Sequence, residues 1–212
     1  MFGPVVQSPT IMCRVYLVPT GKTVWEEQQR LESAIGSPLA DPSVQELHRV
    51  GRLLTQQQIQ ALYCGDAQSE QQSADVLAGH LRLRKRVEPD LHEMDYGLWQ
   101  GLTLTDIRER QPKLYRAWME QPCSIQPPSG ENVQQAADRI WSTVMDILHR
   151  HKHGRVVMVL RPVMLALLRC RLDNIPMDGL WDVSAALEPC NVYDVNGSIK
   201  FLQFIGEPHG GA

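Results

Sequence analysis

The first residue whose type and position could do chemistry is Cys64. It closes an apolar run over residues 61–64 and precedes a Gly65-Asp66 turn, where a thiol can be exposed as a nucleophile. The segment that follows, GDAQSE, carries no arginine that would hold a phosphate group. A buried structural cysteine is therefore the favoured interpretation of Cys64.

A tract of three histidines, His149, His151 and His153, has the composition of a metal-binding segment. It follows a stretch with helical periodicity, however, and cationic side chains at a helix C-terminus interact favourably with the helix dipole. The five cysteines have neither zinc-ligand spacing nor the even number of a disulfide framework. We therefore predict reduced thiols, no metal site and no cofactor.

The overall composition is that of an ordinary globular protein. Of 212 residues, 43% are hydrophobic and 21% are charged, and the formal net charge is -3. This charge provides no basic field for nucleic acid or for anionic membranes. The N-terminus lacks the pattern of a signal peptide, and no apolar run approaches the roughly 18 residues of a membrane span. The expected location is the cytoplasm, with neither nucleic acid nor membrane as a partner.

The residues that could do chemistry need a framework, and the hydropathy pattern indicates strands that alternate with helices. Residues 11–18 are apolar and end at a proline, which predicts a buried strand feeding a tight loop. Residues 43–54 carry one apolar face after Asp41-Pro42, which is typical of a capping Asp and a first-turn proline. The run 61–64 predicts a second strand, and residues 74–81 recur at helical spacing.

The second half of the chain repeats this alternation. Residues 132–148 carry an amphipathic helical pattern, and residues 155–160 form a dense apolar run that enters a helix at 162–172. An Asn-Gly pair, the strongest short hairpin signal, lies between strand patterns at 190–195 and 198–204. We expect this hairpin to add an antiparallel edge to a largely parallel sheet.

Alternating strands and helices predict an α/β fold of a particular kind. It is a three-layer α/β/α sandwich with a mostly parallel sheet, in which the loops after the strands converge on one rim. We expect a single domain over residues 1–212. Residues 82–131 are richer in proline and charge and are expected to form a cap, or excursion, over that rim.

Four stretches, in the same order and at similar spacing, resemble the histidine phosphatase (phosphoglycerate mutase-like) superfamily. LVPTGKTVW is similar to LVRHGETxW, with Arg30 where the family often has R-x-Q-G, and YCGDAQSEQQSA is similar to YSSDLxRAxQTA. LHEMDYGLWQGLT closely resembles LxExDFGxWEGLT. PSGE resembles PGGE, and VVMVLRP stands where VLVVSHG is expected. The first three stretches lie at residues 17–25, 63–74 and 91–103, and the fourth comprises PSGE at 128–131 and VVMVLRP at 156–162.

The resemblance implies a role for each matched position. The family needs an imidazole to attack phosphorus, cations to clamp the phosphoryl oxygens and an acid to protonate the leaving oxygen. The general-acid position is filled by Glu93, whereas the position of the nucleophilic histidine holds Thr20. Pro19 and Ser69 stand where the family has arginines, and Arg161 stands in place of the second histidine. Thr20 has no neighbouring base that would activate its hydroxyl.

From these substitutions we predict a pseudophosphatase that binds without efficient catalysis. Arg161 and Lys22 are expected to meet at the rim with the hydroxyls of Thr20, Thr23 and Ser69, and to hold a phosphate-like anion or a phosphorylated small molecule. A protein partner is the other ligand that the sequence leaves open. The opposing interpretation is that Arg161 and Lys22 pair with Glu93 or point to water.

Two further functions stay open from the sequence. In the first, the chain is an active phosphomonoester phosphatase that uses a non-standard set of residues, with His92, His48 or Lys22 moved into the pocket. In the second, the chain has a structural role as a homodimer, with its pocket closed by side chains such as Arg161. The surroundings of Thr20 and Arg161 distinguish these alternatives.

Overall fold

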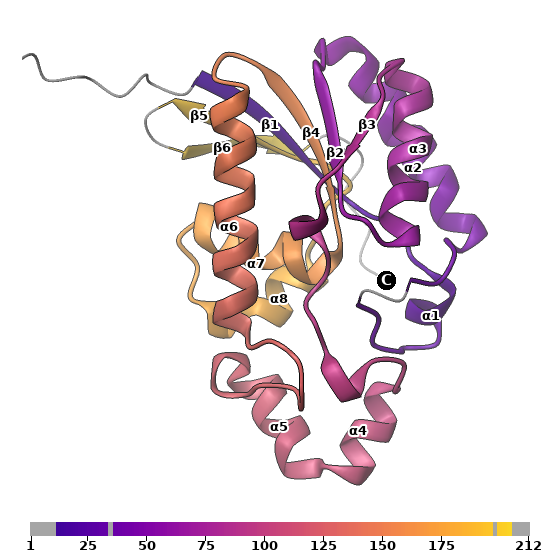
Figure 1. Cartoon of the computed structure of the whole chain (residues 1–212), viewed down its shortest axis with the longest axis vertical. Coiled ribbons are helices and arrows are strands. Elements are labelled where there is room, and N and C mark those ends of the chain that lie inside the picture. The colour runs from indigo at the N-terminus through magenta and orange to yellow at the C-terminus, as the bar shows by residue number, and fades with distance from the viewer. Residues whose placement is uncertain (1–11, 34–35, 197–198, 205–212) are drawn as a thin grey trace, which may run out of the picture.

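The computed structural model describes residues 12–33, 36–196 and 199–204, which include a six-stranded sheet between two layers of helices (Figure 1). The strand order is β3-β2-β4-β1-β5-β6. The first four of these strands run parallel, and β5 runs antiparallel to both of its neighbours, β1 and β6. The strands are β1 (Met12–Pro19), β2 (Ala61–Cys64), β3 (Lys85–Val87), β4 (Arg155–Leu160), β5 (Asn191–Asn196) and β6 (Ile199–Phe204). The predicted α/β architecture, including its antiparallel edge, is confirmed.

The helices are α1 (Val24–Glu27), α2 (Asp41–Leu54), α3 (Gln68–Leu81), α4 (Leu104–Arg110), α5 (Pro112–Glu120), α6 (Val133–Arg150), α7 (Pro162–Leu172) and α8 (Leu180–Ala185). Short 3-10 turns occur at Thr55–Gln57, Pro89–Leu91, Gly97–Trp99, Pro122–Ser124 and Met177–Gly179. None of the helices in the described residues combines the length and the hydrophobicity that a bilayer crossing requires.

Strand alternation divides the core between the two faces of the sheet. In β4, Val156, Met158 and Leu160 pack into one cluster, and Val157 and Val159 pack into the other. Successive side chains of a strand point to opposite faces, so both faces of the sheet must be covered. Helices α6, α7 and α8 cover the first face, and α2 and α3 cover the second (Figure 1).

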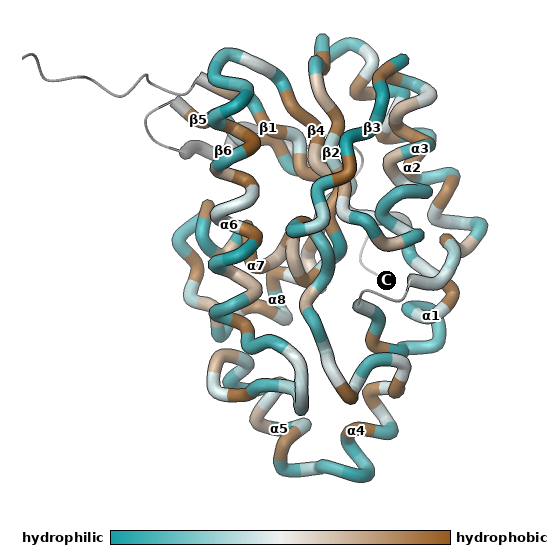
Figure 2. The backbone as a smooth tube through the Cα atoms, in the orientation of Figure 1, coloured by the Kyte–Doolittle hydropathy of each residue, from teal (hydrophilic) through white to brown (hydrophobic). Residues whose placement is uncertain are grey.

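Two helix boundaries differ from the sequence-based expectations. Asp41 lies inside α2 rather than capping it, because Ala40 takes the N-cap position with extended backbone. α6 continues to Arg150, and Asn132 is its cap, since its side chain accepts a hydrogen bond from the N–H of Gln135 at 2.9 Å. The amphipathic pattern of α6 is visible as alternating hydrophilic and hydrophobic colours along the helix (Figure 2).

The boundaries of β1, β5 and β6 differ from the predicted ones by one residue, whereas β2 and β4 match theirs. Residue 11 and Gly197 of the predicted Asn196-Gly197 turn lie outside the described residues, and β1 extends through Pro19. The last two strands begin at Asn191 and Ile199, one residue later than predicted. These shifts are small because the apolar runs, rather than the flanking turns, decide where pairing occurs.

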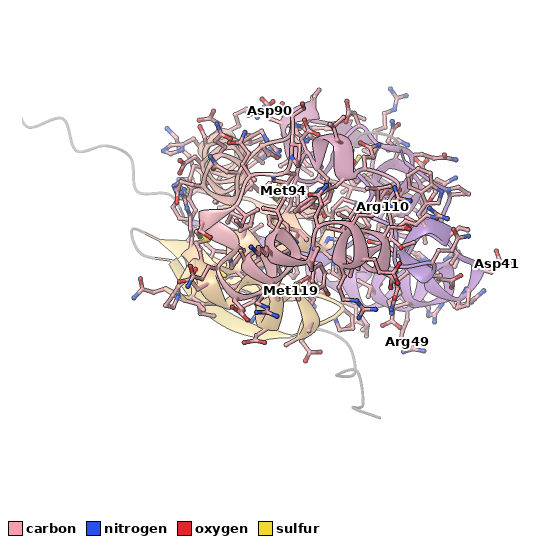
Figure 3. The ribbon with its side chains drawn as sticks, turned by 90° about the horizontal axis from the view of Figure 1, so that it is seen from below. Asp41, Arg49, Asp90, Met94, Arg110 and Met119 are labelled. Atoms are coloured by element: carbon pink, nitrogen blue, oxygen red, sulfur yellow. The ribbon has the colours of Figure 1, made fainter. Side chains whose placement is uncertain are left out.

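The segment between β3 and α6 lies beyond the carboxyl end of the parallel strands. Residues 85–87 pair with β2, so the beginning of the predicted excursion at 82–131 belongs to the sheet. Helices α4 and α5 form the lower end of the molecule in Figure 1. Figure 3 looks at this end from below, with Arg110 of α4 and Met119 of α5 toward the viewer. The loop before α4 is joined to residues 29–31 by an isolated bridge between Arg30 and Thr103.

Parallel pairing places the carboxyl ends of β1, β2 and β4 at the same edge of the sheet. The residues that follow these ends are Thr20, Gly65 and Arg161. Ligand sites of open α/β sheets form at this edge, because the loops there converge. The matched positions Thr20 and Arg161 are therefore brought to one region by the strand topology alone.

Candidate functional site

Arg161 lies at the centre of this region. It follows β4 directly and caps the N-terminus of α7, and its side chain is almost fully buried, with 2% of the residue exposed. One terminal nitrogen donates to the Ser69 hydroxyl at 3.1 Å, and the other donates to the backbone carbonyl of Glu32 at 3.3 Å. The guanidinium therefore links the first turn of α3 to the loop that contains Glu32.

Three carboxylates surround the same guanidinium. Its nitrogens lie 3.4 Å from Glu26, 3.6 Å from Glu32 and 4.0 Å from Glu93. Burial alone lowers the pKa of Arg161, but these carboxylates raise it further than burial lowers it, so the pKa stays above its usual value. Arg161 is a permanent cation whose charge is balanced internally.

Glu93 is held in place by two backbone donors as well as by Arg161. Its carboxylate accepts from the N–H of Met94 at 2.7 Å and from the N–H of Val163, in the first turn of α7, at 3.2 Å. Burial raises the pKa of Glu93 to about 7, although Arg161 and the two N–H groups act in the opposite direction. The residue predicted as the general acid is therefore a buried carboxyl locked into the structure.

Glu32 was not identified from the sequence, although it occupies the Gln position of the family's R-x-Q-G pattern after Arg30. Its carboxylate accepts from the Thr23 hydroxyl at 2.6 Å and from the backbone N–H of Ser37 at 2.7 Å. Thr23 is fully buried and also caps α1 through a capping box with Glu26. Thr23 therefore positions two of the carboxylates and has no hydroxyl proton left for a phosphate.

Glu70 is a fourth carboxyl near Arg161 and, like Glu32, was not identified from the sequence. It lies in the first turn of α3 and accepts from the N–H of Ala67 at 2.9 Å, while its other oxygen has no hydrogen-bond partner among the described residues. Burial raises the pKa of Glu70 to about 8, and Arg161 partly opposes this shift. A β-carbon at Gly65 would lie 2.5 Å from this carboxylate. The sequence did contain a signal for this contact, which is a paired departure from the family pattern. Gly65 stands where the pattern has Ser, and Glu70 stands where it has Ala.

Thr20 and Lys22 lie in the loop that follows β1. Thr20 is 6% exposed, its N–H donates to the carbonyl of Leu160 at 2.9 Å, and its hydroxyl has no partner among the described residues. Lys22 is exposed and makes no ion pair within the described part of the chain. Of the two cations predicted to meet at the rim, Arg161 is therefore internal and Lys22 faces solvent.

His48 and His92, the two histidines considered for the pocket, have other partners. His48 contacts His80 at 2.9 Å between ring nitrogens, and Nδ1 of His92 lies 2.6 Å from the carbonyl of Glu93. His151 contacts the Tyr63 hydroxyl near the amino ends of the strands, on the opposite edge of the sheet. Within residues 12–33, 36–196 and 199–204, no imidazole forms a hydrogen bond with the Thr20 hydroxyl. No cluster of metal-ligating side chains is found in the same residues.

Cys64 is buried at the end of β2, as expected for a structural cysteine. Burial raises the pKa of its thiol to about 12. Because the thiolate is the reactive form of cysteine, Cys64 is poorly suited to act as a nucleophile at neutral pH.

Comparison with known proteins identifies relatives along most of the chain. The family model described as histidine phosphatase superfamily (branch 1) matches residues 15–203. Phosphoserine phosphatase 1 from Hydrogenobacter thermophilus is 21% identical over 170 residues, which cover 80% of this chain and 81% of that protein. A bifunctional protein from Mycobacterium tuberculosis is 32% identical over 143 residues, which cover 67% of this chain and 36% of the longer relative.

Solved structures share the same architecture. YhfR from Bacillus stearothermophilus superposes with a TM-score of 0.84 at 24% sequence identity, covering 89% of this chain and 95% of that one. At this identity the likeness concerns the fold alone, because function depends on the residues of the site.

Proposed function

The chain belongs to the histidine phosphatase superfamily, and we propose that within it this protein is a pseudophosphatase, which acts by binding rather than by phosphoryl transfer. The single observation that carries this proposal is the position of Arg161. Its guanidinium fills the region after β4 and is ion-paired with Glu26, Glu32 and Glu93. Because these ion pairs keep Arg161 positively charged, its side chain does not provide a nucleophile.

Phosphoryl transfer to the protein would need an activated nucleophile. The Thr20 hydroxyl has no described base within hydrogen-bond distance, since it has no hydrogen-bond partner at all among the described residues. Removing a catalytic nucleophile lowers turnover by about a millionfold in a well-studied protease. We expect the turnover of this protein to be lower than that of an active relative by a comparable factor.

The charge balance also disfavours the anionic ligand that the sequence predicted. Four carboxyl groups, those of Glu26, Glu32, Glu70 and Glu93, interact with one guanidinium. A phosphate would have to displace these carboxylates and to lie beside the ones that remain, which costs free energy through desolvation and like-charge repulsion. Of the two ligands left open by the sequence, we therefore propose a protein partner, which includes a second copy of this chain.

The test is a turnover assay of the purified protein with p-nitrophenyl phosphate and with phosphoserine. Phosphoserine phosphatase 1 from Hydrogenobacter thermophilus serves as the positive control. We expect a rate indistinguishable from that of the enzyme-free reaction. A Glu93→Gln variant controls for contamination, since activity that survives this substitution does not come from the site described here.

Turnover that Glu93→Gln abolishes would overturn the proposal and would favour an active phosphatase with non-standard residues. Thermal-shift measurements with millimolar phosphate and vanadate test the anionic ligand separately. No shift is expected, and a saturable stabilisation would contradict the argument from charge. Analytical ultracentrifugation then distinguishes a monomer from a homodimer.

A further inference from the structure

The loop that leads from α6 into β4 is part of a strongly basic surface. This surface, here called the basic edge, consists of residues 149–155 together with Arg86 and Glu88 at β3. Arg86 approaches the ring of His151 at 3.4 Å, so the β3 segment and the loop are in contact. The loop lies at the upper end of the molecule in Figure 1, on the opposite edge of the sheet from Arg161.

The positive charge of the basic edge is mostly unbalanced. Its one carboxylate is that of Glu88, which is paired with Arg150 at 3.1 Å. Arg86, Lys152 and Arg155 make no ion pair within the described part of the chain. Four cations and one carboxylate give a formal charge of +3 with neutral histidines, whereas the whole chain has a net charge of -3. The surface is therefore complementary to an anionic partner.

The dipole of α6 accounts for only part of this charge. The side chains of His149 and Arg150 lie 2.7 and 3.3 Å from the carbonyl oxygens four residues earlier, so both interact with the last turn of the helix. The influence of a helix dipole is confined to that turn. Arg86 and Arg155 belong to β3 and β4, and the helix end does not explain them.

Two arginines and a histidine meet around the side chain of Tyr63. The guanidinium carbons of Arg86 and Arg150 lie 5.5 and 5.8 Å from the centre of its ring. Arg86 donates to the Tyr63 hydroxyl at 3.0 Å, and Nε2 of His151 lies 2.9 Å from the same oxygen. Burial and both guanidinium groups lower the pKa of His151. These basic groups are thus held together before a partner arrives, which lowers the cost of binding.

A hollow of about 560 Å³ opens on the same surface. Its wall consists of Gln60 and residues 149–154, so five of the seven lining residues are basic, none is acidic and none is apolar. A hollow of about 260 Å³ shares residues 153–154 of this wall, and its one carboxylate, that of Asp194, is paired with Arg14 at 2.7 Å. This lining fits a polar anion and offers no contact to an apolar ligand.

The exposure of the cations determines what kind of anion binds. An exposed ion pair contributes about 0–1 kcal/mol, so a single carboxylate or phosphate would be held weakly. Carboxylates linked in one chain bind together, because each contact raises the effective concentration of the next. Two hollows that share part of their walls give room for several such groups. The surface therefore favours an acidic peptide segment over a free anion.

Neither a second copy of this chain nor a membrane fits as well. The only adjacent acidic residues in the sequence are Glu26 and Glu27, and Glu26 is paired with Arg161. Peripheral helices that bind membranes combine basic residues with apolar side chains that insert among the lipids, and the wall of the larger hollow has no apolar side chain. The occupant that fits is a segment of another protein.

We propose that the basic edge docks an acidic segment of a protein partner, whose carboxylates contact Arg86, Arg150 and Lys152. This inference rests on the proposed function as a binding protein and names the chemistry of the partner. The docking surface shares no residue with the Arg161 cluster. Turnover and docking are therefore measured separately, and a failure of one leaves the other to be judged by its own assay.

The test uses a peptide of six glutamates with blocked ends, and a peptide of six glutamines is its uncharged control. Binding to the full chain is followed by ¹H–¹⁵N correlation spectra. We expect saturable shifts with hexaglutamate at the amides of Arg86 and residues 149–155, and none with hexaglutamine. The affinity should fall when the salt concentration rises from about 50 to about 200 mM, since the contacts involve exposed charges.

A matched pair of double variants locates the binding. Arg86→Gln combined with Lys152→Gln removes two unpaired cations, so the affinity for hexaglutamate should fall by roughly three- to thirtyfold. Lys113→Gln combined with Arg116→Gln removes the same two residue types from exposed positions of α5, at the other end of the molecule. This control should change the affinity by less than about twofold, because distant charges are screened.

The ring of His151 provides a second readout. Carboxylates bound beside Arg86 and Arg150 offset the charge that disfavours protonation, so saturating hexaglutamate should raise the pKa of His151. Proton spectra of the imidazole measure this change. The ring signals of His92, which lies beside Glu93 on the opposite edge of the sheet, should not move when the peptide is added.

Four results would overturn the proposal. The first is an absence of saturable shifts with hexaglutamate, or equal shifts with hexaglutamine. The second is an equal loss of affinity in the two double variants, since the site would then lie elsewhere. The third is displacement of hexaglutamate by millimolar orthophosphate, which would assign the surface to a free anion. The fourth is tighter binding to vesicles that contain phosphatidylserine, which would assign it to a membrane.

Discussion

The side chain of Arg161 carries a permanent charge almost out of contact with water. Placing such a group in the interior is expensive unless carboxylates and hydrogen-bond acceptors surround it. Here Glu26, Glu32 and Glu93 supply the charge, and Ser69 supplies a neutral acceptor. Each carboxylate in turn depends on Arg161, so the stability of the cluster rests on a single cation.

Removing that cation is expected to destabilise the protein strongly. Arg161→Met should lower the free energy of unfolding at pH 8 by about 3–5 kcal/mol, since it leaves buried carboxylates without a counter-charge. The loss should be smaller at pH 5.5, where the carboxyl of Glu93, with its pKa near 7, accepts a proton. Urea unfolding at the two pH values measures both quantities.

Arg110→Met is the control for this prediction. Arg110 forms an exposed i,i+4 pair with Asp106 at 3.9 Å, and such pairs contribute about 0–1 kcal/mol. Equal losses for the two arginine variants would mean that the buried cluster does not depend on Arg161.

Glu70 makes the stability depend on pH. Its pKa in the folded state is about 8, above its usual value of 4.5, so the folded protein holds this proton more tightly than the unfolded chain. The resulting stability is fully present below about pH 4.5 and is lost as the pH rises through about 8. Each pKa unit corresponds to about 1.4 kcal/mol, which gives an upper limit of about 5 kcal/mol for the loss.

Glu70→Gln should therefore flatten the stability profile between about pH 5 and pH 8 and stabilise the protein at pH 9 relative to the wild type. Chemical unfolding from pH 5 to pH 9 measures this difference. The control is Glu120→Gln at an exposed position, which should leave the profile unchanged. A wild-type profile that rises between pH 5 and pH 8 would contradict the assignment of a raised pKa to Glu70.

At the scale of elements, the end of β2 and the first turn of α3 are adapted to each other. Gly65 leaves the space that the Glu70 side chain occupies, because a β-carbon there would contact the carboxylate at 2.5 Å. Glu70 uses that space to bond the N–H of Ala67 at the start of the helix. A glycine after a strand and a glutamate in the next helix turn are thus one structural unit.

A double-mutant cycle tests this coupling. Gly65→Ser alone should destabilise the protein by about 1–3 kcal/mol, because the added side chain overpacks the site. In a Glu70→Ala background the same substitution should cost much less, and the coupling energy should exceed about 0.5 kcal/mol. Equal costs of Gly65→Ser in the two backgrounds would show that the two positions are independent.

At the scale of the whole molecule, an aromatic cluster joins the α4–α5 segment to the main core. Trp118 of α5 contacts Trp99 and Trp181 with ring centroids 5.6 and 5.0 Å apart, and the Trp181 indole donates to the Trp118 carbonyl at 2.9 Å. Trp99 and Trp118 are both fully buried. This packing connects the segment to α8 and favours a single cooperative unit.

We therefore expect one unfolding transition for the chain. Trp118→Ala should destabilise this transition as a whole, by about 3–5 kcal/mol, because it opens a cavity between the segment and the core. Urea unfolding followed by far-ultraviolet circular dichroism and by tryptophan fluorescence should give coincident curves for the wild type. A fluorescence transition that precedes the loss of helix would indicate that the segment unfolds separately.

The sequence by itself determined the layers of the fold. Apolar runs at residues 61–64 and 155–160, with helical periodicity between them, were sufficient to predict parallel strands covered by helices on both faces. These patterns are local, because the period of a strand or helix is set by its own backbone geometry. The matched motifs likewise placed Thr20, Ser69, Glu93 and Arg161 at positions that one edge of the sheet brings together.

Only the tertiary structure decided which charges meet. The sequence suggested that Arg161 and Lys22 would face an anion together, whereas Arg161 turns inward to Glu26, Glu32 and Glu93, and Lys22 remains in solvent. Glu26, Glu32 and Glu70 showed no periodic signal, because each is polar in a segment where exposed polar residues are ordinary. Their burial depends on long-range packing around one cation, and no local pattern encodes such a contact.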